Sequence, residues 1–379
     1  MAQRRSQMEV MEIASQGLFN GFYKGKTVFV TGHTGFKGSW LSLWLTALGA
    51  KVVGYALEPP TRPCLFEAAG LAGRVTHVIA DIRDFEKLGS TMQTHRPEIV
   101  FHLAAQPLVR FSYQEPRLTY ETNVMGTVNL FEAVRSTPGV RVCVNVTSDK
   151  CYENNDAVRS YRETDPMGGR DPYSSSKGCA ELVTAAYARS FFGGSNADGG
   201  SVAVSSVRAG NVIGGGDWAE DRLVPDAVRA LSEGREIQIR NPRSVRPWQH
   251  VLEPLCGYLT LAQKMFEKGE AYTGAWNFGP REEDALPVHD VASRIVTLWG
   301  TGTWRDVSRN TPDAPHEARY LKLDSTKARR ELGWKSVLEI DAALAMTIDW
   351  YKRFYGRKEN MYAYSVRQLA EYGKGLGPS

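Results

Sequence analysis

Two residues four positions apart could perform proton chemistry. Tyr173 and Lys177 open an Ala-rich run that extends to Arg189, so on a helix both side chains share one face. A free phenol has a pKa of about 10, and a nearby ammonium group stabilises its phenolate. The pair could therefore act as a tuned proton acceptor. The spacing alone is common, and it fits a solvated pair on an ordinary helix equally well.

A second polar group, Ser148, Asp149 and Lys150, follows an apolar run at 142–146 that predicts a buried strand. Open α/β sheets bind their ligands at the carboxyl ends of parallel strands. We therefore expect this group to face a ligand. Asp149 suits a general acid if burial keeps it protonated, and Lys150 suits a base if it is neutral. Alternatively, Lys150 is a fixed cation that pairs with Asp149 or a phosphate.

A glycine-rich turn near the N-terminus predicts a dinucleotide site. A strand at 26–31 is followed by a turn and a helix at 39–48. The first glycine permits a tight turn, the second lets a pyrophosphate approach, and the third lets helix and strand pack closely. The candidate cofactor contacts in this turn are Gly32, His33, Thr34, Gly35, Phe36, Lys37 and Gly38.

Further strands are predicted at 51–57, 75–80 and 99–103, and five strand–helix units in succession favour an α/β doubly wound parallel sheet of the Rossmann type. Asp81 and Ile82 could bracket an adenine, or Asp81 could cap a helix. The second strand lacks the usual ribose-binding acid, and Arg62 follows it; we favour NAD over NADP. The remaining candidate cofactor contacts are Leu103, Ala104, Ala105 and Thr122.

Composition excludes several classes of protein. The chain has 379 residues, 42% of them hydrophobic, and a net charge of +4, without the basic tracts of nucleic-acid-binding proteins. Five scattered cysteines without a Cys-x-x-Cys pair predict neither a disulfide framework nor a metal site. No apolar run approaches the roughly 20 residues that a membrane helix needs. We expect a cytoplasmic enzyme with no nucleic-acid or membrane partner.

The domain organisation follows from these patterns. We predict an N-terminal extension at 1–24 and a cofactor-binding domain at 25–206, rejoined by about 247–280. A smaller C-terminal substrate-binding lobe would comprise 207–246 and 281–379. Three arginines lie within 240–246, where they form either a solvated loop or a clamp on a diphosphate.

These motifs resemble the extended short-chain dehydrogenases that modify nucleotide sugars. The resemblance covers about 25–355 and rests on the glycine-rich turn, on 102–105, on 173–177, on Arg208-Ala209-Gly210-Asn211-Val212 and on 277–279. The segments 32–40, 147–152 and 246–251 resemble in particular the 4,6-dehydratases of cytidine-diphosphate sugars. The dTDP-glucose dehydratases carry Thr-Asp-Glu at 148–150, and their Glu takes the C5 proton; Lys150 stands there in this chain.

The resemblance implies an NAD-dependent hydro-lyase that supplies a deoxysugar, as in O-antigen synthesis. Tyr173 would take the sugar 4-hydroxyl proton, and Ser148 would bind the 4-oxygen. Lys177 would lower the Tyr173 pKa and hold the nicotinamide ribose, so Tyr173 and Lys177 are also candidate cofactor contacts. The candidate substrate contacts are Gln106, Arg208, Asn211, Arg243, Arg246 and His250. Family members commonly pair through a four-helix interface, which implies a homo-oligomer, either a dimer or a tetramer.

Two alternatives stay open. The first is another reaction within the family, either 4-epimerisation or dehydration of a UDP- or dTDP-sugar. The second is a regulator that senses dinucleotides without turnover, because fold alone does not establish catalysis. The presence of Tyr173, Lys177, Ser148 and Asp149 argues against a regulator, since a sensor has no use for a proton relay.

Overall fold

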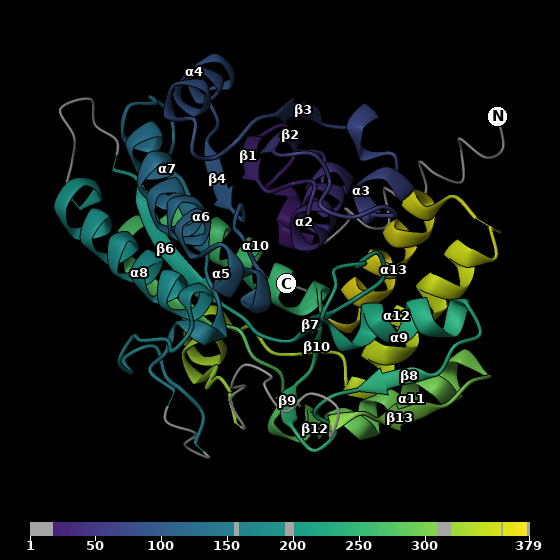
Figure 1. The fold of residues 1–379 in the computed structure, drawn as a ribbon. Helices are drawn as coiled ribbons and strands as arrows, with labels where there is room; N and C mark the ends of the chain where they lie inside the picture. The colour runs from purple at the N-terminus through teal and green to yellow at the C-terminus, as the bar shows by residue number, and fades with distance from the viewer. Residues whose placement is uncertain (1–17, 155–158, 194–200, 309–319, 358, 377–379) are drawn as a thin grey trace, which may run out of the picture.

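The computed structural model describes residues 18–154, 159–193, 201–308, 320–357 and 359–376, and a seven-stranded parallel sheet lies at its centre (Figure 1). The strand order is β11-β6-β5-β4-β1-β2-β3. Strands β2 and β3 are added on one side of β1 and β4, β5, β6 and β11 on the other, so the order of strand addition reverses beside β1. The strands are β1 (Thr27–Thr31), β2 (Lys51–Ala56), β3 (Thr76–Ile79), β4 (Ile99–His102), β5 (Val142–Val146), β6 (Ala203–Arg208) and β11 (Gly274–Asn277). The predicted doubly wound fold is confirmed.

The register brings the predicted polar segments to one edge of the sheet. Thr31 pairs with His102, His102 with Asn145, and Val146 with Val207. The strands β1, β4, β5 and β6 therefore end together. The segments that follow them, 32–38, 103–106, 147–150 and 209–211, emerge side by side at this edge.

Two hydrophobic clusters cover the two faces of the sheet. One contains residues of α2 (Phe36–Ala47), α10 (Leu252–Lys268) and α13 (Met361–Gly375). The other contains residues of α4 (Phe85–His95) and α7 (Gly126–Arg135), with α8 (Pro172–Tyr187) packed against it. Neighbouring residues of one strand belong to different clusters, as Val28 and Phe29 do, because successive side chains point to opposite faces.

A second group of elements gathers below the sheet in Figure 1. It contains α9 (Leu223–Ser232), α11 (Val288–Trp299), α12 (Ile340–Tyr355) and three two-stranded sheets. The sheets pair β7 (Val212–Ile213) with β10 (Gln249–His250), β9 (Val245–Pro247) with β12 (Ala285–Pro287), and β8 (Ile237–Ile239) with β13 (Trp304–Asp306). Short helices α3 (Leu65–Ala68), α5 (Val109–Gln114) and α6 (Pro116–Tyr120) complete the connections.

The start of the described chain is anchored on α10. The hydroxyl of Tyr23 donates to the carbonyl of Leu259 at 2.6 Å, and Phe22 packs edge-on against Phe266. Residues 1–17 of the predicted extension lie outside the described residues. Among the described helices, none is both long and apolar enough to cross a membrane.

Candidate active site

Helix α8 carries Tyr173 and Lys177 inward from its first turns. Asp171 caps the helix by accepting a hydrogen bond from the Ser174 amide at 2.9 Å, and Pro172 occupies the first turn, where no amide donor is needed. Tyr173 is 8% exposed and Lys177 6%. The alternative interpretation, in which Tyr173 and Lys177 are a solvated pair on an ordinary helix, is therefore wrong.

Burial controls the acidity of both groups. It raises the pKa of Tyr173 to about 12, although a hydrogen bond with Ser148 acts in the opposite direction. Burial also lowers the pKa of the Lys177 ammonium to about 8, and its Nζ lies 3.4 Å from the carbonyl of Val146. Desolvation of the phenolate outweighs the opposing influence of the Arg222 guanidinium on the Tyr173 pKa. The lowering of this pKa by Lys177 stays a prediction.

The polar group after β5 faces this helix. Ser148 begins the short 3-10 helix Asp149–Cys151: its hydroxyl accepts from the Lys150 amide at 3.2 Å and donates to Asp149 Oδ1 at 3.1 Å. Asp149 is 1% exposed, and within the described structure its Oδ2 has no hydrogen-bond partner. Lys150 Nζ lies 3.9 Å from Asp149 Oδ1, and 36% of its side chain is exposed. The structure thus brings a hydroxyl, a carboxyl and an ammonium group to the Tyr173 side of the sheet.

The glycine-rich turn forms an open cradle at the start of α2. Gly32 has a φ of +72°, and a Cβ there would lie 2.7 Å from the Ala104 amide nitrogen. A Cβ at Gly38 would lie 2.1 Å from the Gly32 carbonyl oxygen. Gly35 is the N-cap of α2, and no described side chain caps this end. Its first-turn amides can therefore receive a diphosphate, and the residues present fit a dinucleotide.

The other predicted cofactor residues surround this cradle. The Thr31 hydroxyl accepts from the amides of Leu103 and Ala104 at 3.1 Å, which fixes the segment after β4 beneath the turn. The Thr34 hydroxyl donates to the Leu57 carbonyl at 2.9 Å. Asp81 forms an ion pair with Arg83 at 2.6 Å. The remaining ones follow the ends of the strands or lie on a helix: His33 and Phe36 follow β1, Ile82 follows β3, Ala105 follows β4, and Thr122 lies on the π-helix Glu121–Met125.

Lys37 occupies the same cradle. Burial lowers the pKa of its ammonium group to about 8, Arg222 and Lys177 lower it further, and Asp149 raises it. These influences place Lys37 among the charges of the catalytic group.

The predicted substrate residues fall into two sets. Asn211 has a φ of +44°, and its buried Nδ2 has no partner among the described residues. Arg243 is exposed, and Arg246 is partly buried on β9, where it donates to the Val245 carbonyl at 3.0 Å. These three stay candidates for binding a ligand.

The second set is engaged with the protein itself. The Gln106 amide donates to the Thr119 hydroxyl at 2.9 Å, and the Arg208 guanidinium pairs with Glu181 at 2.6 Å. His250 is fully buried and accepts from the Leu252 amide at 3.3 Å, and burial lowers its pKa to about 3. Their substrate roles stay predictions, while their observed contacts are internal.

The sequence analysis did not identify two charged residues near the site, Arg222 and Glu181. Arg222 pairs with the buried Asp217 at 2.8 Å and lies near enough to Tyr173 to lower the pKa of its phenol. The sequence offers nothing that singles it out. Glu181 stands four residues after Lys177, so helical spacing could have identified it as a third member of the same face.

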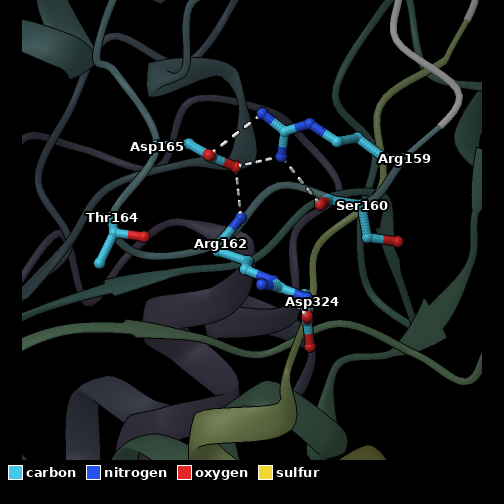
Figure 2. Close-up of a pocket in the computed structure, with 6 residues that line it drawn as sticks. All are labelled: Arg159, Ser160, Arg162, Thr164, Asp165 and Asp324. Atoms are coloured by element: carbon cyan, nitrogen blue, oxygen red, sulfur yellow. Dashed lines mark hydrogen bonds and ion pairs between the residues drawn. The ribbon is translucent and has the colours of Figure 1, made fainter.

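A pocket of about 460 Å³ lies between the 159–165 segment and Asp324 (Figure 2). Arg159 pairs with Asp165 at 2.6 Å, and Arg162 pairs with Asp324 at 3.1 Å. None of its lining residues is a predicted site residue. They are Arg159, Ser160, Arg162, Thr164, Asp165 and Asp324.

The doubly wound sheet, the glycine-rich turn and the Tyr–Lys helix together define a short-chain dehydrogenase of the extended, nucleotide-sugar type. A family model described as GDP-mannose 4,6 dehydratase matches residues 29–347. The chain belongs to this family, and the predicted resemblance is confirmed.

Individual relatives agree with this assignment. The chain is 53% identical to the CDP-glucose 4,6-dehydratase of Salmonella typhimurium (strain LT2) over 352 residues, which cover 93% of this chain and 97% of the relative. A dTDP-glucose 4,6-dehydratase from Streptomyces venezuelae, solved with NAD bound, superposes with a TM-score of 0.73 and 25% identity, over 88% of this chain and 99% of that one. A UDP-glucose 4-epimerase from Thermotoga maritima shares the fold, with a TM-score of 0.74 and 24% identity over 86% and 99% of the two chains.

Proposed function

We propose that this chain is an NAD-dependent CDP-glucose 4,6-dehydratase, which converts CDP-glucose to CDP-4-keto-6-deoxyglucose. The observation that carries the proposal is the buried Tyr173–Lys177 pair facing Ser148, Asp149 and Lys150, in a chain 53% identical to a relative with that name. When bound, NAD supplies a reversible hydride acceptor, which lets C4 be oxidised and C6 later reduced without a second redox substrate.

Tyr173 takes the proton of the sugar 4-hydroxyl. Its hydrogen bond with Ser148 supports this role, because the same hydroxyl can hold the 4-oxygen in place. Lys177 supplies a cation four residues away on the same face of α8. The dinucleotide would be held by the turn at 32–38 and by the amides at the start of α2.

Asp149 and Lys150 remove water across C5 and C6. A ketone at C4 acidifies the C5 proton, so the elimination follows oxidation. Lys150, whose side chain is partly exposed, is the candidate base in its neutral amine form or, as an ammonium group, the cation that stabilises the enolate. Asp149, almost fully buried and with an unpartnered oxygen within the described chain, is the candidate acid for the departing 6-hydroxyl.

The predicted substrate-binding lobe, 207–246 and 281–379, takes the nucleotide. Asn211 supports this division, because a left-handed residue with an unused, buried amide group within the described structure suits a ligand contact. Arg243 and Arg246 are the candidates for the diphosphate, which a planar guanidinium binds in bidentate fashion.

We also propose a homo-oligomer built on α7 and α8. Leu182 is 61% exposed, Phe191 44% and Met125 52%, whereas Leu130 and Phe131 are buried within the chain itself. Leu182 lies on α8, whereas Met125 and Phe191 lie on the π-helical turns that precede α7 and follow α8. These exposed apolar side chains support the four-helix interface. The molecular mass in solution tests this.

The substrate is tested by incubating the protein with NAD⁺ and, in turn, CDP-, UDP-, dTDP- and GDP-linked hexoses. Mass analysis of the product should show the loss of one water from CDP-glucose in preference to the others, and alkali should develop the chromophore of a 4-keto-6-deoxy sugar. Dehydration of another nucleotide sugar instead, epimerisation without loss of water, or binding without turnover would each overturn the proposal.

A further inference from the structure

An ion pair lies inside the protein directly behind the catalytic residues. Glu181 Oε2 and Arg208 Nη2 are 2.6 Å apart, and each side chain is only 4% exposed. Glu181 lies on α8, four residues after Lys177 and eight after Tyr173, and Arg208 ends β6. Buried pairs of this kind add little net stability compared with an apolar replacement. We therefore ask whether the Glu181–Arg208 pair positions the elements around it rather than stabilising the fold.

The carboxylate of Glu181 joins the catalytic helix to the ends of two strands. It accepts hydrogen bonds from the hydroxyls of Thr147 and of Ser206, the latter at 2.6 Å. Thr147 directly precedes Ser148. Glu181 thus fixes the face of α8 that carries Tyr173 and Lys177 against the start of the Ser148–Lys150 segment.

The guanidinium of Arg208 holds the other end of that segment. Its Nη1 donates to the hydroxyl of Tyr152 at 2.6 Å, and Tyr152 follows Lys150 by two residues. The Tyr152 hydroxyl in turn donates to Asn277 Oδ1 at 2.8 Å, at the end of β11. One ion pair therefore contacts both ends of the segment that carries Ser148, Asp149 and Lys150.

We propose that Glu181 and Arg208 are positioning residues, which hold the Tyr173–Lys177 helix and the Ser148–Lys150 segment in one fixed arrangement. The inference rests on the proposed function, since it assumes that these two groups act on the same sugar. Misplacing a catalytic group by about 1 Å can reduce a rate by roughly 10²-fold. The binding of the nucleotide depends on other elements, so loss of the ion pair should lower kcat far more than it raises KM.

The test uses the full chain with Glu181→Gln, which keeps the size of the side chain, and Tyr152→Phe, which removes only the hydroxyl between Arg208 and Asn277. Arg162→Gln is the matched control, because it breaks the Arg162–Asp324 pair on the surface, where the arginine is 71% exposed (Figure 2). We expect kcat to fall by about 10²-fold in Glu181→Gln and about 10-fold in Tyr152→Phe. KM should stay within threefold in both, and the control should keep both constants.

A second measurement does not need turnover. Hydrogen–deuterium exchange should increase in the peptides covering 145–153 and 172–182 of Glu181→Gln, and should not change in the control. The kinetics are measured on whichever nucleotide sugar the wild-type protein converts, so a wrong substrate would overturn only the proposed function. Unchanged kcat and exchange in both variants, or an increase in KM equal to the loss in kcat, would overturn the positioning role.

Discussion

The substitution Gly38→Ala isolates the cradle of the glycine-rich turn. The added Cβ would lie 2.1 Å from the Gly32 carbonyl oxygen, whereas ordinary contact begins at 3.4 Å, so the two must separate by 1.3 Å. The other nearest atoms, Gly32 C and His33 Cα, also belong to the backbone, so a rotamer change cannot relieve the clash. Either α2 or the turn has to move.

The cost follows from two opposing effects. Alanine gains about 1 kcal/mol over glycine inside a helix, while overpacking costs roughly 1–3 kcal/mol. We expect a net loss of up to about 2 kcal/mol in the free energy of unfolding. The larger effect is on function, because a shift of more than 1 Å at the start of α2 moves the amides that would receive the diphosphate. NAD⁺ affinity should fall at least tenfold and turnover by about 10²-fold.

The matched control is Gly89→Ala in α4, where an added Cβ meets no atom within 4 Å in the described structure. This variant should be slightly more stable than the wild type and should bind NAD⁺ normally. Titration calorimetry with NAD⁺ and thermal unfolding of both variants measure the two effects. Wild-type NAD⁺ affinity in Gly38→Ala would refute the assignment of the cradle.

Three further predictions concern other parts of the chain. Glu253 is buried and accepts from the Tyr372 hydroxyl and two backbone amides, and burial raises its pKa to about 7. The folded state holds this proton more tightly than the unfolded state. The free energy of unfolding should therefore fall by on the order of 3 kcal/mol as the pH rises from about 4.5 to 7. Glu253→Gln should abolish this pH dependence when the free energy of unfolding is measured by chemical denaturation. Lys150→Met should still reduce bound NAD⁺ in a single turnover but release no dehydrated sugar, and normal product would exclude Lys150 as the base. Asn211→Gly should raise the melting temperature slightly, since it relieves a positive φ, yet raise KM at least tenfold; an unchanged KM would remove Asn211 from the substrate site.

Local pattern was enough to predict the sheet and the site's position. The three-residue spacing of Gly32, Gly35 and Gly38 predicts a strand–turn–helix unit. The apolar run at 142–146 predicts a strand, and Ser148 follows the end of that strand. The four-residue interval between Tyr173 and Lys177 placed both on one face, because a helix has a fixed period.

Properties that depend on distant segments could not be predicted in this way. The Tyr173 pKa depends on how deeply the lobe and sheet bury the phenol, and no local pattern gives that depth. Arg208 was predicted to bind substrate, but its ion pair with Glu181 becomes visible only when α8 lies against β6. Arg222 reaches Tyr173 through the packing of the 214–222 segment, which has no periodicity to reveal it.

The central claim is that one hydride leaves C4 of the sugar and returns to C6 within a single site. The direct measurement is turnover of CDP-glucose that carries deuterium at C4, with the product examined by mass spectrometry and NMR. The account predicts one deuterium at C6 of the 4-keto-6-deoxy sugar and no loss to solvent. Deuterium that exchanges into water, or that stays at C4, would contradict it.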